Sequence, residues 1–132
     1  MRLNGDRIAD VLACAQAIAD RFARHSVDTL KNTPDAVKAT FYDVIAMGEA
    51  MRDLVAKRDS SDNKIADDSE IVKANPQIPW ADWIGMRDMV THQYFRAAPE
   101  IIWRDHESGE LGKLIACCKA WLERDLSGTT SG

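Results

Sequence analysis

The sequence predicts an all-α protein, an antiparallel helical bundle of four to five helices. Apolar residues recur at spacings of three and four along most of the chain, which is the period of one face of an α-helix. No segment alternates apolar and polar residues as a half-buried strand would, and no internal repeat occurs. Helices joined by polar connections therefore account for the pattern.

The first half of the chain predicts two long helices. The first covers residues 5–25, and a polar segment, HSVDTLKNT, follows its apolar stripe. Thr33 as N-cap, Pro34 at the first helical position and Asp35 in the first turn predict the start of the second helix. Its apolar period continues to about residue 58.

The second half predicts a long connection and three more helices. Residues 59–79 are polar, acidic and closed by two prolines, which is typical of a connection, and residues 67–74 fit a short helix within it. Further helices are expected at 80–95, at 99–106 and after Gly109.

Length and composition predict one domain. A chain of 132 residues can bury a core without metal or disulfide support, and 45% hydrophobic with 29% charged residues is ordinary for a globular protein. We expect the helical domain to cover residues 1–126 and the small polar residues 127–132 to form a disordered tail. No apolar run approaches the ~20 residues that a membrane span needs, and the polar N-terminal segment does not resemble a secretory signal.

Charge and cysteine usage also bear on function. The net charge of −4 excludes a basic field over the whole surface, so a nucleic-acid site would have to be local. Three cysteines form neither a CxxC pair nor an even set, which favours free, buried thiols in a reducing cytoplasm. They are Cys14, Cys117 and Cys118.

Arg87 is the unexpected residue of the third long helix. At 100° per residue it falls in the middle of an apolar stripe. Burying an unpaired guanidinium costs several kcal/mol, so Arg87 either faces an anion or a wet cleft, snorkels to solvent, or pairs with an internal carboxylate such as Glu49. The stripe comprises Trp83, Ile84, Val90 and Tyr94.

His92 lies about 140° around an ideal helix from Arg87 and about 7.5 Å along its axis. Taken alone it fits an exposed or satisfied histidine. It converges with Arg87 only if the chain bends after Thr91, or if a second copy of the chain supplies the missing partner. Tyr94 alone fits a half-buried aromatic whose hydroxyl is satisfied.

Taken together, these residues form a motif, Arg87-Asp-Met-Val-Thr-His92-Gln-Tyr94, that resembles the Rx4HxY signature of the HepT-like ribonuclease toxins in the HEPN superfamily. The flanking segments IPWADWIGMRD and YFRAAPEIIW are similar to the family's, and FYDVIAMGEA resembles its second helix. The similarity spans about residues 5–126. The chain departs from the family pattern at Ala97, Ala98 and Gly112.

The resemblance implies a metal-independent endoribonuclease without a cofactor, acting in the cytoplasm as a homodimer. Arg87 and His92 would be the catalytic residues of a cleft between two protomers, with Asp88 and Glu49 as supporting residues. The RNA 2′-hydroxyl can attack its own phosphate when a group of near-neutral pKa moves the proton, which suits His92. Arg87 would hold the phosphate through two parallel hydrogen bonds. The expected substrate is RNA, with tRNA as the first choice.

Tyr94 would be the regulatory position. In the family, an MntA-like nucleotidyltransferase antitoxin transfers AMP from ATP to this tyrosine, which places a bulky anion beside the catalytic pair.

Two other classes of function fit the same residues. The chain could be a non-catalytic HEPN partner, or substrate-docking subunit, of a minimal nucleotidyltransferase. It could also be a helical dimerisation protein in which Arg87 makes only a structural salt bridge.

Overall fold

The computed structural model describes residues 6–58, 70–92 and 98–130. This part of the chain contains seven helices and no strand. They are α1 (Asp6–Ala23), α2 (Val27–Lys31), α3 (Pro34–Arg58), α4 (Glu70–Ala74), α5 (Trp80–Thr91), α6 (Ala98–Glu107) and α7 (Glu110–Thr130). Five of them have ten residues or more, so the expected all-α bundle is confirmed. Of the two five-residue helices, α4 falls within the short helix expected at 67–74, whereas α2 was not expected.

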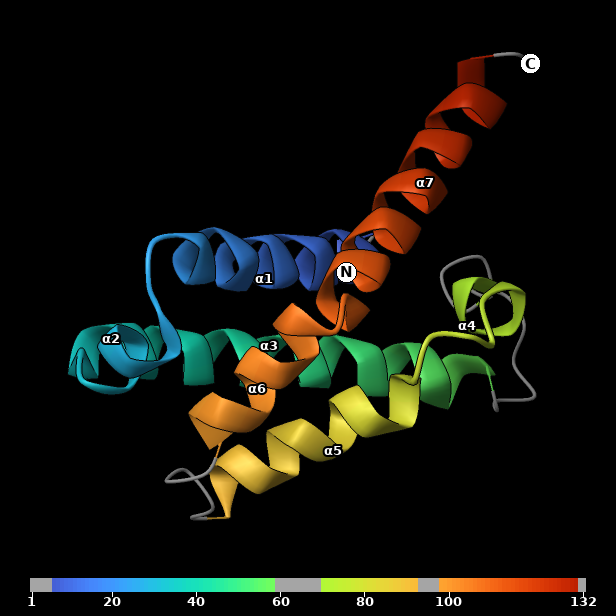
Figure 1. Ribbon diagram of the computed structural model, residues 1–132. Coiled ribbons are helices and arrows are strands. Elements are labelled where there is room, and N and C mark those ends of the chain that lie inside the picture. Colours follow the sequence, from blue (N-terminus) through green and yellow to red (C-terminus); the bar gives the residue numbers. More distant parts are fainter. Residues whose placement is uncertain (1–5, 59–69, 93–97, 131–132) are drawn as a thin grey trace.

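Helix α3 is the centre of the bundle. It runs antiparallel to α1 on one side and to α5 on the other, and α7 crosses α1 (Figure 1). Apolar side chains from every helix meet in one core, because each helix keeps one apolar stripe turned inward. The largest fully buried side chains are Phe22, Ile8, Ile18, Leu30, Met47, Met51, Leu54, Ile71, Ile102, Leu111 and Leu114.

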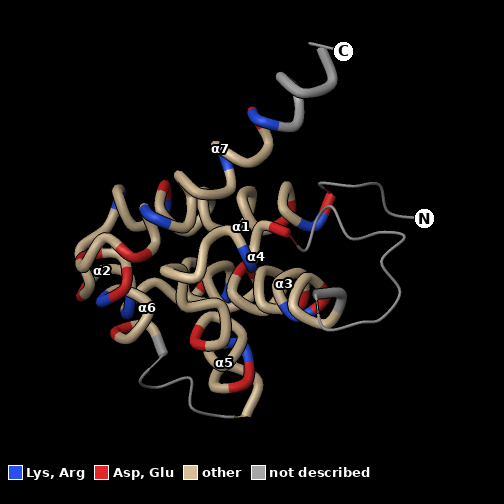
Figure 2. The backbone as a smooth tube through the Cα atoms, turned by 90° about the vertical axis from the view of Figure 1, so that its right-hand side faces the viewer, with Lys and Arg blue, Asp and Glu red and all other residues tan. Residues whose placement is uncertain are grey.

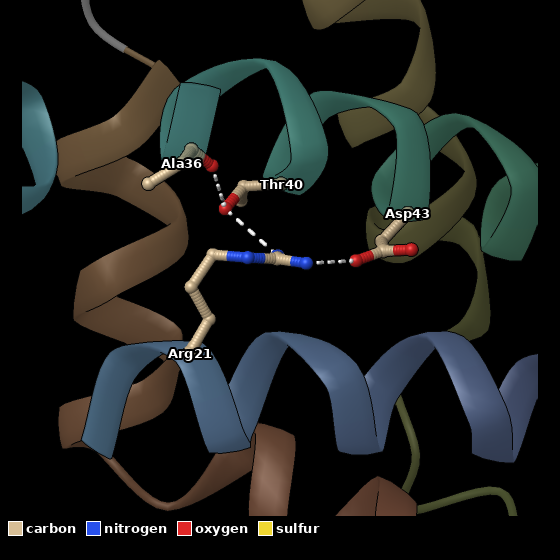
Figure 3. A network of polar contacts seen from close by, with 4 residues as sticks. All are labelled: Arg21, Ala36, Thr40 and Asp43. Atoms are coloured by element: carbon tan, nitrogen blue, oxygen red, sulfur yellow. Dashed lines mark hydrogen bonds and ion pairs between the residues drawn. The ribbon is translucent and has the colours of Figure 1, made fainter. Parts of the chain in front are cut away.

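A buried polar network connects α1 to α3 (Figure 3). Arg21 Nη2 donates to Asp43 Oδ2 at 2.9 Å, and Arg21 Nη1 donates to Thr40 Oγ1 at 3.1 Å. The Thr40 hydroxyl donates in turn to the carbonyl oxygen of Ala36 at 2.8 Å. Because each polar group has a partner, the network fixes how α1 lies along α3 without leaving a buried charge unpaired.

Helix α2 occupies part of the segment that the sequence analysis treats as a polar connection. Ser26 is its N-cap: the Ser26 hydroxyl accepts from the Thr29 backbone N–H at 3.1 Å, and Thr29 Oγ1 accepts from the Ser26 N–H at 2.9 Å. This is a reciprocal capping box with threonine in place of the usual Glu or Gln. Helix α3 begins at Pro34 as expected, but the Thr33 hydroxyl donates back to the Thr29 carbonyl at 2.6 Å.

Two helix ends differ from expectation. Helix α5 ends at Thr91 rather than at residue 95, with His92 as its C-cap. Helix α7 continues to Thr130, beyond the expected end of the domain at 126, so residues 127–130 are helical rather than a disordered tail. Its last turns project away from the other helices, and the Gly128 in them lowers helix propensity without ending the helix (Figure 1).

The cysteines are free thiols, as predicted. Cys14 on α1 and Cys117 on α7 are partly buried, and Cys118 is buried. Burial raises the pKa of the Cys118 thiol to about 12 and that of the Cys14 thiol to about 11. These thiols are therefore protonated at neutral pH and suited to packing rather than to nucleophilic chemistry.

Candidate functional site

The motif lies at the C-terminal end of α5. Arg87 is in its penultimate turn, and His92 is the residue at which the chain leaves the helix, with φ −104° and ψ 32°. The His92 backbone N–H still donates to the Asp88 carbonyl at 2.9 Å. The chain therefore leaves regular helix after Thr91, which is one of the two conditions under which His92 could converge with Arg87. Tyr94, Ala97 and the segment between them lie outside the described residues.

Arg87 is paired with two carboxylates. Its Nη2 forms an ion pair with Glu49 Oε1 on α3, and its Nη1 donates to Asp88 Oδ1 at 2.9 Å. The Arg87 side chain is 21% exposed, whereas those of Glu49 and Asp88 are 50% and 55% exposed. The pairing with Glu49 that the sequence allowed is confirmed, but this Glu is half-exposed rather than internal.

The Nε of Arg87 is buried and has no hydrogen-bond partner in the described part of the chain. A buried guanidinium N–H without an acceptor is unfavourable by roughly 1–3 kcal/mol. Solvent does not reach the Nε in this arrangement. An oxyanion that approached Arg87 would compete for its Nη groups with carboxylates that water already reaches.

Arg87 is not in the middle of the buried stripe. The buried residues of α5 are Trp80, Trp83, Met86 and Val90, and Ile84 is only partly buried. On a helical wheel the centre of this set lies about 45° from Arg87, so the arginine sits toward the edge of the core. Ile84 packs against the core as predicted but is only partly buried, whereas Met86, which the predicted stripe omitted, is buried.

Gly48 explains how Arg87 comes to be largely buried. A Cβ built on this α3 glycine would lie 2.6 Å from the Cβ and 3.2 Å from the Cδ of Arg87. Real Cβ atoms do not approach so closely, so only glycine lets the Arg87 stem lie against α3. The stem is covered in this way while the guanidinium reaches Glu49.

The His92 side chain is exposed, and no hydrogen bond or ion pair links its ring to the described residues. Arg87 and His92 thus occur on one element within two turns, without direct contact. Within a single chain, Arg87 therefore lies one to two turns before the helix end that carries the exposed His92.

Sequence reasoning missed a second group of titratable residues. A cavity of about 370 Å³ is lined by Asp82 and Trp83 of α5, Asp105 of α6 and Glu110 of α7, among others. Burial first, and then the charge of Glu110, raise the pKa of Asp105. The carboxylates come from three elements, so no local motif could reveal them, and their charge disfavours RNA at this cavity.

The charge distribution supports a local site. Basic and acidic positions are interspersed over the helices rather than separated into two faces (Figure 2).

Within the described ranges, no group of three or more His, Cys, Asp or Glu side chains is arranged to hold a metal ion. None of the described helices combines the length and apolar character that crossing a membrane requires.

A family model described as ribonuclease HepT-like matches residues 11–120. This range includes α2 to α6, most of α1 and the first half of α7, and it contains the whole motif from Arg87 onward. No curated protein and no solved structure shows a significant match to the chain. Because the family model covers most of the chain, the protein belongs to the HepT-like family of ribonucleases.

Proposed function

We propose that this protein is an endoribonuclease toxin that cleaves RNA, with tRNA as the first expected substrate, at a site built from Arg87 and His92. The observation that carries the proposal is the largely buried Arg87 guanidinium, whose Nε has no partner and whose other contacts are exposed carboxylates. In a chain of a ribonuclease family, a phosphate is the anion that such a group is best suited to bind.

The proposed reaction is an internal transesterification that needs no metal ion. A base removes the proton of the 2′-hydroxyl, and the 2′-oxygen attacks the adjacent phosphorus. The P–O5′ bond breaks, and the departing O5′ receives a proton from an acid. The products are a 2′,3′-cyclic phosphate and a 5′-hydroxyl end. Arg87 would bind the non-bridging oxygens and stabilise the charge that grows on them.

His92 would carry out the proton transfer, because imidazole is the side chain best matched to neutral pH. One imidazole is not enough for base and acid in the same turnover. A two-fold homodimer would supply the partner's His92 for the second transfer. Asp88 and Glu49 would hold Arg87 in place before RNA binds and would yield it to the phosphate.

Regulation would act on Tyr94, two residues after His92. An MntA-like nucleotidyltransferase antitoxin would transfer AMP from ATP to the phenol oxygen, releasing pyrophosphate. The added phosphate would compete with RNA for Arg87, and its bulk would block access to His92. Incubation with such an enzyme and ATP should raise the intact mass by AMP in the wild type and not in Tyr94→Phe, and should abolish RNA cleavage only in the wild type.

The test of the catalytic proposal uses purified protein, free of any partner, with total tRNA and EDTA. Wild type should give products ending in 2′,3′-cyclic phosphate, whereas Arg87→Ala and His92→Ala should be folded and inactive. His25→Ala, which changes a histidine between α1 and α2, is the matched control and should cleave normally.

Two outcomes would contradict the proposal. Inactive wild type with unmodified Tyr94, bound tightly to a nucleotidyltransferase in native mass spectrometry, would favour the non-catalytic HEPN partner. A sharp loss of thermal stability in Arg87→Gln, without any RNA cleavage by wild type, would favour the structural salt bridge.

A further inference from the structure

Tyr42 on α3 is a large aromatic side chain without a structural explanation in the described part of the chain. Its exposed fraction is 72%, and no other large hydrophobic side chain described is exposed in this way. The core does not use it, and no hydrogen bond of its hydroxyl to a described residue accounts for its position. A tyrosine exposed to this extent is a common feature of surfaces that bind other molecules.

The position of Tyr42 relates it to the candidate site. Tyr42 and Glu49 are seven residues apart, so they lie on the same outer face of α3, about 10.5 Å apart along its axis. Glu49 is the residue that pairs with Arg87. Because α5 runs antiparallel to α3 (Figure 1), the C-terminal end of α5, where His92 is the C-cap, lies toward the N-terminal half of α3, which contains Tyr42.

A basic residue extends the same face. Lys38 precedes Tyr42 by one helical turn and is exposed. No ion pair joins Lys38 to the described residues, in contrast to Lys31, which pairs with Glu100, and Lys113, which pairs with Glu110. From Lys38 through Tyr42 to Arg87, the face carries a cation without an ion pair to the described residues, an exposed aromatic ring and a second, largely buried cation. The carboxylates of Asp35 and Glu49 lie on the same face, so the site for an anionic strand is confined to the positions of Lys38 and Arg87.

This order matches the chemistry of single-stranded RNA, in which phosphates alternate with bases that stack on aromatic rings. We propose that Tyr42 stacks on a base of the RNA next to the cleavage site, and that Lys38 contacts the phosphate beyond it. Tyr42 is then a positioning residue of the RNA path rather than a catalytic one. The proposal rests on the proposed ribonuclease function and adds a side chain that binds single-stranded RNA.

The test measures binding of a fluorescein-labelled oligouridylate, and of an abasic oligomer of the same length, by anisotropy. His92→Ala serves as the background so that the RNA stays intact. Adding Tyr42→Ala should weaken binding of the oligouridylate by about 5- to 150-fold, which is the loss of affinity expected when one base no longer stacks on an aromatic ring. Binding of the abasic oligomer should change little, because it has no base to stack. Adding Tyr42→Phe should keep the affinity within about threefold, because the ring remains.

Lys38→Gln provides an independent readout. It should weaken both oligomers alike and reduce the slope of log affinity against log salt by about one. Lys119→Gln on α7, which removes the same charge from another exposed position, is the matched control and should leave the slope unchanged.

The outcomes separate this inference from the proposed function. If wild type cleaves RNA and Tyr42→Ala binds the oligouridylate as tightly as its background, the stacking role is wrong while the ribonuclease stands. If Tyr42→Ala converts a dimer to a monomer in light scattering, the ring belongs to an interface between two copies and the inference is overturned. If wild type neither binds nor cleaves RNA, the proposed function fails first.

Discussion

Gly48 on α3 lies so close to Arg87 on α5 that a side chain at position 48 would collide with the Arg87 side chain. A Cβ on Gly48 would lie 2.6 Å from the Arg87 Cβ. The contact covers the aliphatic stem of Arg87 and directs its guanidinium to Glu49, at the edge of the core rather than inside it. The geometry of the candidate site therefore depends on a residue that has no chemistry of its own.

Gly48→Ala should lower the free energy of unfolding in urea by about 1–3 kcal/mol, because the new methyl group forces α5 outward. It should also reduce RNA cleavage, since Arg87 moves with α5. Gly85→Ala and Gly112→Ala are the matched controls: nothing lies within 4 Å of their added Cβ. Both should stabilise the protein by about 0.5–1 kcal/mol through helix propensity. Equal stability of the Gly48 and Gly85 variants would show that α5 does not depend on this approach.

Glu49→Gln should free Arg87 for an anion at little cost in stability. The Glu49 carboxylate is half-exposed, so its loss should change the free energy of unfolding by less than about 1 kcal/mol. RNA affinity, measured in the His92→Ala background, should rise by up to about fivefold because one competing anion is gone.

Glu100→Gln controls for net charge in that experiment. It removes one carboxylate from another exposed ion pair, with Lys31, that does not involve Arg87. A gain in RNA affinity that is the same in both variants would be a general charge effect, and would count against a phosphate site at Arg87.

The helices could be predicted from the local sequence, whereas the geometry of the candidate site depends on contacts between helices that the sequence does not show. The buried residues of α1 all follow the spacing of three and four that predicts this helix: Ile8, Val11, Ala15, Ile18 and Phe22. Helix α2 was missed because Thr29 stands where a capping box normally has Glu or Gln.

The details around Arg87 required the tertiary structure. Periodicity predicted the helix that contains Gly48 but did not show that this glycine makes room for Arg87. Ile84 and Met86 are both apolar, and only the direction from which α3 and α6 approach decides that Met86 is buried. The cavity carboxylates Asp105 and Glu110 meet Asp82 only after α6 turns into α7 at Gly109, whose φ is +89°.

Asp43→Ala should be among the most destabilising single substitutions. It leaves the Arg21 guanidinium largely buried without its carboxylate, which costs about 3–5 kcal/mol in comparable pairs. Asp53→Ala, which breaks a pair with Arg7 that is exposed on the Asp53 side, should cost under about 1 kcal/mol. The double variant Arg21→Met/Asp43→Leu should recover most of the stability in urea unfolding. Failure to recover would mean that the pair itself contributes net stability, rather than only avoiding an unpaired charge.

Asp105 should make the protein less stable as pH rises. Burial raises its pKa above the ordinary value of 3.8, so in that range the folded state binds more protons than the unfolded state. The unfolding free energy then falls as pH rises from about 3.8 through the folded-state pKa, and the penalty is complete at neutral pH. Asp105→Asn should therefore raise the melting temperature at pH 7. The gain should stay under about 1 kcal/mol, because solvent screens this partly exposed charge.

The pH dependence of the stabilisation by Asp105→Asn distinguishes removal of the Asp105 charge from a packing or hydrogen-bonding effect of the new asparagine amide. The stabilisation by Asp105→Asn should shrink between pH 7 and pH 4, because the wild-type carboxyl becomes protonated in the folded state. Asp82→Asn should change stability in the same direction by less, since the Asp82 charge contributes less to the Asp105 pKa than burial does. A stabilisation that is equal at both pH values would come from packing or hydrogen bonding of the amide, and would remove the electrostatic explanation.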